Sequence, residues 1–422
     1  MSVLINISKI PKEKMQSIDT ALNITIEDKN KKTKIYVHPY RVQGVLGFIP
    51  FNFAIKNSFM PMKHTKLTQV YTFKGTLRAE QKIVRDEAFA ILNRVNSLLL
   101  SVHVGFGKSI LATYFAYKIR MKTLILVNRI ILMEQWKKVL NDFLEAPKIQ
   151  VLKSSDIVDW DCDFFIMNAI NMPKFGYMPE IGLLIIDEVH LIMSKVLSTC
   201  FQYITPTYLI GLSATSYRLD GFHILFNLYF GGEENSIDRK LQREHIVHVV
   251  DTGFSPRIVR LPRNNNKVDW NDILNQQALN EDRNRIIVKI IENFPDLNFM
   301  ILCKRVDQIK LIQKLLEEKS ILAEYIYGEH NPDKTLQSRI LIGTIQKLGT
   351  GFDAPWLNAL IIAADLEAYF IQYLGRVFRK KEIVPIVFDL VDQNNILKKH
   401  FRTREETYIS HGGIIRSFVL NK

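Results

Sequence analysis

Short apolar segments alternate with longer amphipathic segments from about residue 76 onward. The longer segments, such as 107–121 and 131–145, have apolar residues at the spacing of an amphipathic helix. The short segments lack polar alternation, which is typical of strands that are buried on both faces of a parallel sheet. We expect the first series of strands at 97–102, 123–128, 163–168, 183–187 and 208–214.

A second series repeats this pattern, with expected strands at 298–304, 339–344, 359–364 and 385–391. Helical patterns such as 305–319 separate them. Strands that alternate with helices predict an α/β fold with right-handed crossovers, so two tandem α/β lobes with parallel sheets are expected. The segment 251–270 contains Pro, Gly and an Asn run, and we expect it to connect the lobes.

Residues 1–75 have a different pattern, in which β-branched and aromatic residues are broken by Gly and Pro. This pattern predicts short strands and turns, in a small accessory domain that is β-rich or α+β. The predicted domains are therefore 1–75 as the accessory domain, 76–232 as the first lobe, and 233–422 as a linker and the second lobe.

Composition points to a polyanionic partner but does not prove one. The 422 residues include 56 Lys and Arg against 43 Asp and Glu, a net charge of +13. Such a charge favours nucleic acid, although a basic protein with no such partner fits equally well. The cysteines Cys162, Cys200 and Cys303 lie too far apart to indicate a zinc site or a disulfide framework. We expect no signal peptide, no membrane span and a reducing, intracellular location.

The segment GFGKS, residues 105–109, follows the first expected strand and precedes a helical pattern. Gly105 and Gly107 would let the backbone curl around phosphate oxygens at the positive end of that helix. Lys108 would neutralise the β and γ phosphates, and the Ser109 hydroxyl would bind Mg²⁺. The usual first glycine of this motif is replaced by Val102. The alternative is a glycine turn that caps a helix beside a solvated lysine.

The segment LLIIDEVH, residues 183–190, ends an apolar strand in two adjacent carboxylates. Such a strand would deliver Asp187 to the carboxyl edge of the sheet, where α/β folds bind their ligands. Asp187 would then hold Mg²⁺ through water, and Glu188 would orient and deprotonate the attacking water. His190 would contact the γ-phosphate or connect it to the other lobe. The alternative is a polar strand end whose carboxylates lie in solvent.

Seven short motifs in a fixed order make the sequence resemble a superfamily 2 helicase. They are TLRAEQ (76–81), GFGKS (105–109), LVNRIILMEQW (126–136), IIDEVH (185–190), GLSATSYRLDG (211–221), IGTIQKLGTGFDAP (342–355) and QYLGRVFRK (372–380). The resemblance implies two RecA-like lobes with the ATP site in the cleft between them. The fifth and sixth motifs are most similar to one branch of the superfamily. That branch contains the eukaryotic transcription and repair-factor helicase, the phage recombination helicases and the transcript-release helicases of large DNA viruses. Compact size and AT-rich residue usage favour the viral members, which would place the protein in host cytoplasm or virion.

In the first lobe, the resemblance assigns Gln81 to adenine recognition and the loop residues Val104, Gly105, Phe106 and Gly107 to phosphate binding. It gives Lys108, Ser109, Asp187 and Glu188 the roles argued above, with ATP and Mg²⁺ as cofactors. The alternative for Gln81 is a surface helix residue.

The same resemblance assigns Ser213, Ala214 and Thr215, together with His190, to the coupling of hydrolysis to strand movement. Their alternative is a strand end whose hydroxyls cap the next turn. Ser216 stands where the family usually has proline.

In the second lobe, Arg376 and Arg379 match the paired arginines that stabilise charge on the γ-phosphoryl oxygens. An arginine finger is worth roughly 10³- to 10⁵-fold in rate in P-loop enzymes. Gln372, Gly351 and Asp353 match residues near the nucleotide. The alternative for this arginine segment is a basic helix face that contacts nucleic acid.

A motor that ignores sequence needs contacts to phosphates, and residues that directly follow strands could face one groove. The candidates are Asn128, Arg129, Asn168, Lys304, Arg305, Thr344 and Gln346. The alternative for each is a loop residue in solvent.

Three functions remain open on the sequence alone. The leading interpretation is an ATP-dependent helicase or translocase on DNA, moving 3′ to 5′ by resemblance only, with RNA as the other substrate. The second is a motor that releases RNA transcripts or remodels protein–DNA complexes without much unwinding, together with transcription or replication machinery. The third is a nucleic-acid-binding scaffold without hydrolysis, against which the intact catalytic residues argue.

Overall fold

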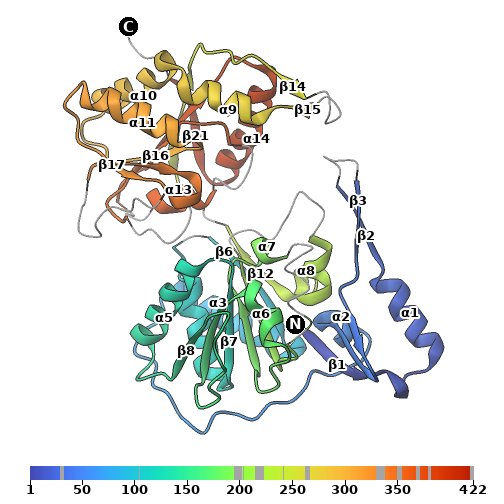
Figure 1. The fold of residues 1–422 in the computed structure, drawn as a ribbon. Helices are drawn as coiled ribbons and strands as arrows, with labels where there is room; N and C mark the ends of the chain where they lie inside the picture. Colours follow the sequence, from blue (N-terminus) through green and yellow to red (C-terminus); the bar gives the residue numbers. More distant parts are fainter. Residues whose placement is uncertain are drawn as a thin grey trace. The chain divides into compact units, whose positions relative to one another are not determined.

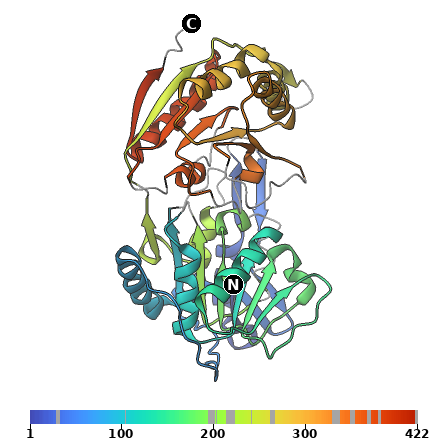
Figure 2. The same ribbon diagram turned by 90° about the vertical axis from the view of Figure 1, so that its left-hand side faces the viewer.

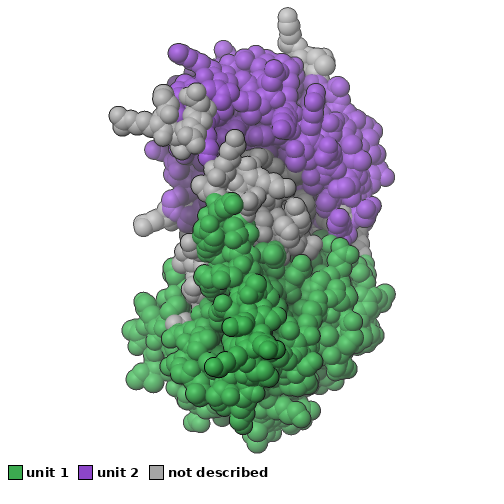
Figure 3. Space-filling model, turned by 90° about the vertical axis from the view of Figure 1, so that its right-hand side faces the viewer, with its two compact units in different colours: residues 1–239 green, residues 240–422 purple. Residues whose placement is uncertain are grey.

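Two seven-stranded sheets, one in each part of the chain, form the frame of the computed structural model (Figures 1 and 2). The structure describes residues 1–28, 33–103, 105–193, 202, 204–213, 223–240, 242–261, 267–328, 338–348, 354–366, 371–378 and 382–418. The chain divides into two units, Met1–Arg239 and Lys240–Lys422, which are coloured separately in Figure 3.

All strands of the first unit's large sheet run parallel. Their spatial order is β12 (Ser236–Arg239), β6 (Ser97–Val102), β11 (Tyr208–Ser213), β10 (Leu183–Ile186), β7 (Thr123–Val127), β9 (Phe164–Asn168) and β8 (Ile149–Leu152). Every strand expected in this region from apolar patterning is present, and the prediction of a parallel sheet is confirmed. β8 and β12 were not anticipated, because their sequences mix polar and apolar residues.

Helices and the N-terminal segment cover the two faces of this sheet, which explains the uninterrupted apolar strands. Alternate strand residues belong to different cores: Leu98 and Leu100 pack against one set of helices, while Leu99 faces the opposite side. The helices of the first core are α3 (Ala79–Val95), α4 (Lys108–Ile119) and α5 (Ile130–Phe143). The opposite face carries α6 (Met172–Phe175), α7 (Val189–Ile192) and α8 (His223–Tyr229).

The N-terminal residues form an α+β block, as predicted, and share the second of these cores. Its elements are β1 (Ser2–Asn6), α1 (Lys12–Leu22), β2 (Ile24–Asp28), β3 (Thr33–Val37), β4 (Arg41–Gln43), β5 (Leu46–Pro50) and α2 (Phe51–Lys56). The amino group of Met1 and the backbone N–H of Ser2 each donate to the Ile204 carbonyl oxygen, at 2.8 Å. Because Met1 and Ile204 are both buried, the block is continuous with the first unit.

The second unit is built on an equally parallel sheet. Its order is β17 (Glu324–Ile326), β18 (Ile340–Thr344), β16 (Phe299–Cys303), β19 (Ala359–Ile362), β20 (Ile386–Val391), β13 (His245–Asp251) and β21 (Gly413–Phe418). The expectation that 251–270 connects the lobes is wrong. β13 already pairs with β20 in this sheet, so the segment after it lies within the second unit. That segment contains the short antiparallel pair β14 (Arg260–Leu261) and β15 (Lys267–Val268).

Helices also cover both faces of the second sheet. They are α9 (Trp270–Leu279), α10 (Glu281–Asn293), α11 (Val306–Glu317), α12 (Ile345–Leu348), α13 (Ile371–Val377) and α14 (Asn395–Ser410). In the part of the chain that the structure describes, no helix combines the length and apolarity needed to cross a membrane.

A buried ion pair fastens α14 to the second sheet. The Arg404 guanidinium donates Nε to Asp389 Oδ2 and Nη2 to Asp389 Oδ1, both at 2.8 Å. Arg404 Nη1 also donates to the Leu366 carbonyl, and the Tyr408 hydroxyl donates to Asp389. Arg404, Asp389 and Tyr408 are almost fully buried. A bidentate pair with further hydrogen bonds satisfies both charges, which is the condition for tolerating them in a core.

We expect Asp389→Asn to lower the free energy of unfolding by about 3–5 kcal/mol, because it removes the bidentate anion of a buried guanidinium. The other carboxylate partner of Arg404, Asp365, accepts from it only through Nη1, at 3.2 Å. Urea denaturation of the full chain, followed by tryptophan fluorescence, measures the effect. The control is Glu281→Gln, which also replaces a carboxylate by its amide. Glu281 forms an exposed pair with Arg285 on α10, so this variant should leave the unfolding transition unchanged. Equal unfolding midpoints for the two variants would contradict the role assigned to the pair.

Candidate nucleotide site at the carboxyl edge of the first sheet

The loop between β6 and α4 has the backbone that a phosphate cradle requires. Gly105 and Gly107 have φ of 83° and 92°, in the left-handed region that favours glycine. Gly107 directly precedes the first residue of α4, Lys108. The Lys108 ammonium donates to the Val102 carbonyl oxygen at 3.1 Å, so it folds back over the loop. This arrangement places a lysine, a helix N-terminus and two permissive glycines around one short turn.

Two side chains from the start of α3 bind the same loop. Gln81 Nε2 donates to the Phe106 carbonyl oxygen at 2.8 Å, while Gln81 Oε1 accepts from the Arg78 backbone N–H at 2.9 Å. The Arg78 guanidinium donates to the carbonyl oxygens of Gly105 and Phe106. Gln81 is buried, which contradicts the alternative of a surface helix residue. Arg78 is not among the residues that the sequence predicts for the site, although it stands three residues before Gln81 in the motif RAEQ.

Asp187 follows β10 and is held by two N–H donors. Trp136 Nε1 on α5 donates to Asp187 Oδ2 at 2.8 Å, and the Glu188 backbone N–H donates to Asp187 Oδ1 at 2.9 Å. Burial and the neighbouring Glu188 carboxylate raise the pKa of Asp187 to about 6, while Trp136 and the Lys108 charge act in the opposite direction. A divalent cation bound at this carboxylate would lower the pKa of Asp187 and so favour its ionised form. Asp187 is therefore not the solvated strand end that the alternative interpretation required.

Glu188, His190 and Ser213 lie next to each other. Glu188 has φ of 46°, a left-handed conformation that is strained for a residue with a side chain. The His190 ring nitrogen Nδ1 lies 2.9 Å from Ser213 Oγ and 3.4 Å from Glu188 Oε2. His190 and Ser213 are buried. The structure thus brings together two of the predicted coupling residues and the predicted general base; Ala214 and Thr215 lie outside the described residues.

These groups meet because β6, β11 and β10 are neighbours that run in the same direction. Lys108 comes after β6, Ser213 ends β11, and Asp187 comes after β10. The carboxyl ends of parallel strands lie at one edge of the sheet, so all three reach the same edge. Ser109 is half-buried in the first turn of α4, directly after Lys108, and it offers a hydroxyl oxygen as a second metal ligand beside the Asp187 carboxylate. An oxygen-only donor set of this kind suits Mg²⁺.

Part of the predicted site in the second unit lies outside the described residues. Arg376 is half-buried on α13. Gln372 belongs to the same helix, but its side chain is not described. The remaining predicted site residues outside the described part of the chain are Val104, Gly351, Asp353 and Arg379.

The predicted strand-contact residues occupy the carboxyl edges of the two sheets. Asn168 pairs with Val127, so Asn128 directly follows the neighbouring position on β7. Arg129 then occupies the N-cap position of α5. The Asn168 side chain accepts from the Ile170 backbone N–H at 3.2 Å, which gives it a local capping role as well.

The corresponding residues of the second unit follow β16 and β18. Thr344 pairs with Cys303, the last residue of β16, and Lys304 directly follows that strand. Arg305 occupies the N-cap position of α11, and its side chain donates to Asn271 Oδ1 at 2.7 Å. Gln346 is exposed on α12. Each sheet therefore presents its predicted contacts along one edge.

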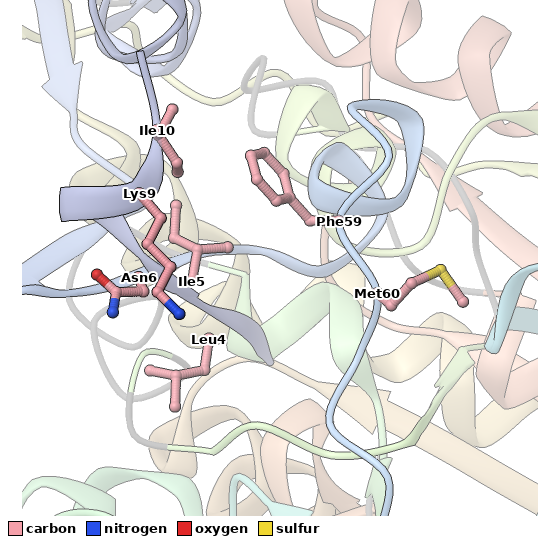
Figure 4. A pocket seen from close by; sticks show the side chains of 7 residues that line it. All are labelled: Leu4, Ile5, Asn6, Lys9, Ile10, Phe59 and Met60. Carbon is pink, nitrogen blue, oxygen red and sulfur yellow. The ribbon is translucent and has the colours of Figure 1, made fainter. Parts of the chain in front are cut away.

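A separate pocket of about 320 Å³ lies in the N-terminal block. Figure 4 shows Phe59 and Met60 on one side of it and residues of β1 and the following turn on the other. Its only charged lining residue is Lys9. None of its lining residues belongs to the predicted site, and it offers no pair of groups for acid–base chemistry.

Comparisons with known proteins identify a matching family model and several relatives. Residues 74–218 match the model of the family "Type III restriction enzyme, res subunit". Protein 161L of Invertebrate iridescent virus 6, named as a helicase, is 38% identical over 100% of both chains. Protein L396 of Acanthamoeba polyphaga mimivirus, named as an ATP-dependent RNA helicase, is 27% identical over 84% of this chain and 72% of its own.

A more distant relative and one solved structure extend the comparison. The DNA 3′–5′ translocase XPB2 of Sulfurisphaera tokodaii is 21% identical over 73% of this chain and 80% of its own. The S. cerevisiae protein Dbp5, bound to RNA and ADP BeF3, has a TM-score of 0.55 at 11% identity. That alignment covers 79% of this chain and 89% of Dbp5, and it supports the tandem RecA-like fold.

The loop geometry predicts unequal effects of two glycine substitutions. Alanine at either Gly105 or Gly107 should lower the free energy of unfolding by about 1–2 kcal/mol, because both positions have a left-handed backbone conformation. A Cβ on Gly105 meets nothing within 4 Å, whereas one on Gly107 would lie 2.5 Å from Gln81 Nε2. Gly107→Ala must therefore displace the Gln81 amide and should cost about 1 kcal/mol more. Urea denaturation without nucleotide measures the difference, and equal losses would contradict the packing described here.

Proposed function

The chain belongs to the superfamily 2 helicases, and we propose that its first unit binds Mg²⁺–ATP at the carboxyl edge of its sheet. Membership follows from 38% identity over the full length of a helicase relative. The protein is accordingly an ATP-hydrolysing helicase or translocase with nucleic acid as its partner. The residues that perform each step, and the kind of nucleic acid, are proposals.

One observation carries the site assignment: adjacent parallel strands bring Lys108, Ser213 and Asp187 to one sheet edge, and Gln81 on α3 hydrogen-bonds to the phosphate loop. A solvated lysine beside an unrelated acidic turn would not explain the buried, hydrogen-bonded Asp187 carboxylate. It would also not explain why His190 contacts both Glu188 and Ser213.

In this proposal the loop's backbone N–H groups and Lys108 bind the phosphates. The ammonium of Lys108 exchanges the Val102 carbonyl for phosphate oxygens. Ser109 and Asp187 hold Mg²⁺, which when bound neutralises charge on the phosphates. Glu188 orients the attacking water and accepts its proton. Gln81 selects adenine with the N–H of Nε2 and the lone pair of Oε1 that its two present hydrogen bonds leave free.

The second unit supplies the arginines in this proposal. Arg376 on α13, together with Arg379, stabilises the charge that develops on the γ-phosphoryl oxygens. His190 and Ser213 relay the change at Glu188 to the end of β11, from which residues 214 and 215 continue. Strand movement follows if the two nucleotide states hold the nucleic acid with different strength.

DNA is the proposed substrate, with movement 3′ to 5′. The relative XPB2 is named as a DNA 3′–5′ translocase, and the sequence motifs resemble the same branch. The mimivirus relative, named as an RNA helicase, supports RNA as the competing candidate. A motor that releases transcripts or remodels protein–DNA complexes, with transcription or replication machinery as partner, remains the second proposal. Translocation without strand separation would distinguish it from a helicase.

ATPase rates with and without single-stranded DNA, duplex DNA and RNA test the proposed function. We expect strong stimulation by DNA, and near-complete loss in Lys108→Ala and Glu188→Gln, since one removes the phosphate charge partner and the other the base. Lys118→Ala is the matched control, because Lys118 lies exposed at the far end of α4 and should leave the rate unchanged. Wild-type rates that no nucleic acid alters would contradict the motor, and stronger stimulation by RNA would reverse the substrate assignment.

Binding of single-stranded DNA at increasing salt tests the contact residues. Each phosphate contact that is lost should reduce the slope of log affinity against log salt by about one ion. We therefore expect shallower slopes for Arg129→Ala and Arg305→Ala. Arg285→Ala, an exposed arginine on α10 paired with Glu281, serves as control and should keep the wild-type slope. Wild-type slopes in all three variants would remove both residues from the proposed track.

A further inference from the structure

A buried indole N–H connects α5 to the carboxylate that we assign to Mg²⁺. Trp136 is 2% exposed, and its ring packs in the core formed by α3, α4, α5 and the first sheet. An indole has one donor and no acceptor, and a buried donor needs a partner. Trp136 Nε1 finds that partner in Asp187 Oδ2, 51 residues away along the chain and 2.8 Å away in space.

Two donors hold the Asp187 carboxylate in one orientation. Oδ2 accepts from Trp136 and Oδ1 accepts from the Glu188 backbone N–H. Hydrogen bonds to both oxygens of an aspartate carboxylate restrict its rotation about the Cβ–Cγ bond. Each oxygen keeps a second lone pair, which is available to a metal ion or to its water ligands. Partners of this kind, one step removed from a metal, set the direction in which a ligand presents its oxygens.

Helix α5, labelled in Figure 1, begins directly after two of the predicted nucleic-acid contacts, and it contains this tryptophan. Arg129 occupies the N-cap position and Asn128 precedes it, while Trp136 lies seven residues, or about two turns, beyond Arg129. Met133, Trp136 and Leu140 form its buried stripe against the sheet. A helix anchored in this way moves as one piece, so a displacement at its first turn reaches the indole.

We propose that Trp136 is a positioning residue. Its indole N–H holds the Asp187 carboxylate toward Mg²⁺ and couples the orientation of this carboxylate to movements of α5. This inference rests on the proposed function, because it assumes that Asp187 binds the metal. It adds a residue that touches neither ATP nor nucleic acid. It also gives a physical route by which a nucleic-acid strand bound at Asn128 and Arg129 tightens Mg²⁺–nucleotide binding. By reciprocity, bound Mg²⁺–nucleotide must tighten nucleic-acid binding by the same factor.

The test measures binding of N-methylanthraniloyl-ADP by fluorescence anisotropy, with EDTA, with Mg²⁺, and with Mg²⁺ plus single-stranded DNA or RNA. In Trp136→Phe, which keeps an aromatic ring but loses the donor, the tightening caused by Mg²⁺ should fall by roughly 10- to 100-fold. Affinity in EDTA should remain at the wild-type level, and the further tightening caused by nucleic acid should disappear.

Trp160→Phe is the matched control, because Trp160 packs on the other core of the same unit, against Phe165. It should retain both effects. A second substitution at position 136, β-(3-benzothienyl)alanine, replaces only the N–H by sulfur, and it keeps the test valid if phenylalanine does not fold. Melting curves in EDTA verify that each variant is folded.

Three results would overturn the inference. A folded Trp136 variant with the wild-type Mg²⁺ effect shows that the hydrogen bond does not position Asp187. Equal loss of affinity in EDTA and in Mg²⁺ assigns Trp136 a general structural role. If the Mg²⁺ effect falls but nucleic acid still tightens nucleotide binding, the link through α5 is excluded. By contrast, a wild-type protein that shows no Mg²⁺ effect at all refutes the proposed metal site itself, which distinguishes the two failures.

Discussion

In the first unit, β6, β11 and β10 hydrogen-bond to one another in one direction, and the proposed chemistry depends on this pairing. Each strand delivers one component of the site at its carboxyl end: the phosphate loop, the Ser213 hydroxyl, and the Asp187–Glu188 pair. No single segment of sequence contains the site. If one of these strands ran in the opposite direction, its component would lie at the other edge of the sheet.

Apolar patterning was sufficient to predict the central strands, because strands buried on both faces have sequences without polar alternation. The same rule fails at the sheet margins. β12 has the sequence SIDR and β21 the sequence GIIRSF, and both are edge strands whose pairing is decided by partners far away in the chain. β13 is mostly apolar, but the glycine and proline that follow it predict a connector between the lobes. The second sheet has already begun at this point, because β13 is one of its strands.

The candidate site was predictable where a residue type has one chemical use at its position, as for Lys108 after two glycines. It was not predictable where the role depends on a distant partner. Arg78 lies in a motif that was identified, yet its hydrogen bonds go to carbonyl oxygens of a loop 27 residues further along the chain. Trp136 also lies in an identified motif, and nothing in its local pattern distinguishes it from a core residue of an amphipathic helix. Only the fold brings its N–H to Asp187.

Three of the groups that the proposed function directs at the nucleotide have a hydrogen-bond partner within the protein. Lys108 binds the Val102 carbonyl, Gln81 binds the Phe106 carbonyl, and Asp187 accepts from Trp136 and Glu188. In the proposed function Lys108 exchanges its contact to the Val102 carbonyl for one to phosphate, so the net gain is smaller than the new contact itself. Gln81 and Asp187 differ, because their present partners leave one amide N–H and further lone pairs free and need not be released. The metal carboxylate and the adenine-binding glutamine can therefore stay fixed while the phosphate-binding lysine changes partners. Such a division suits an enzyme that binds and releases ATP in every cycle.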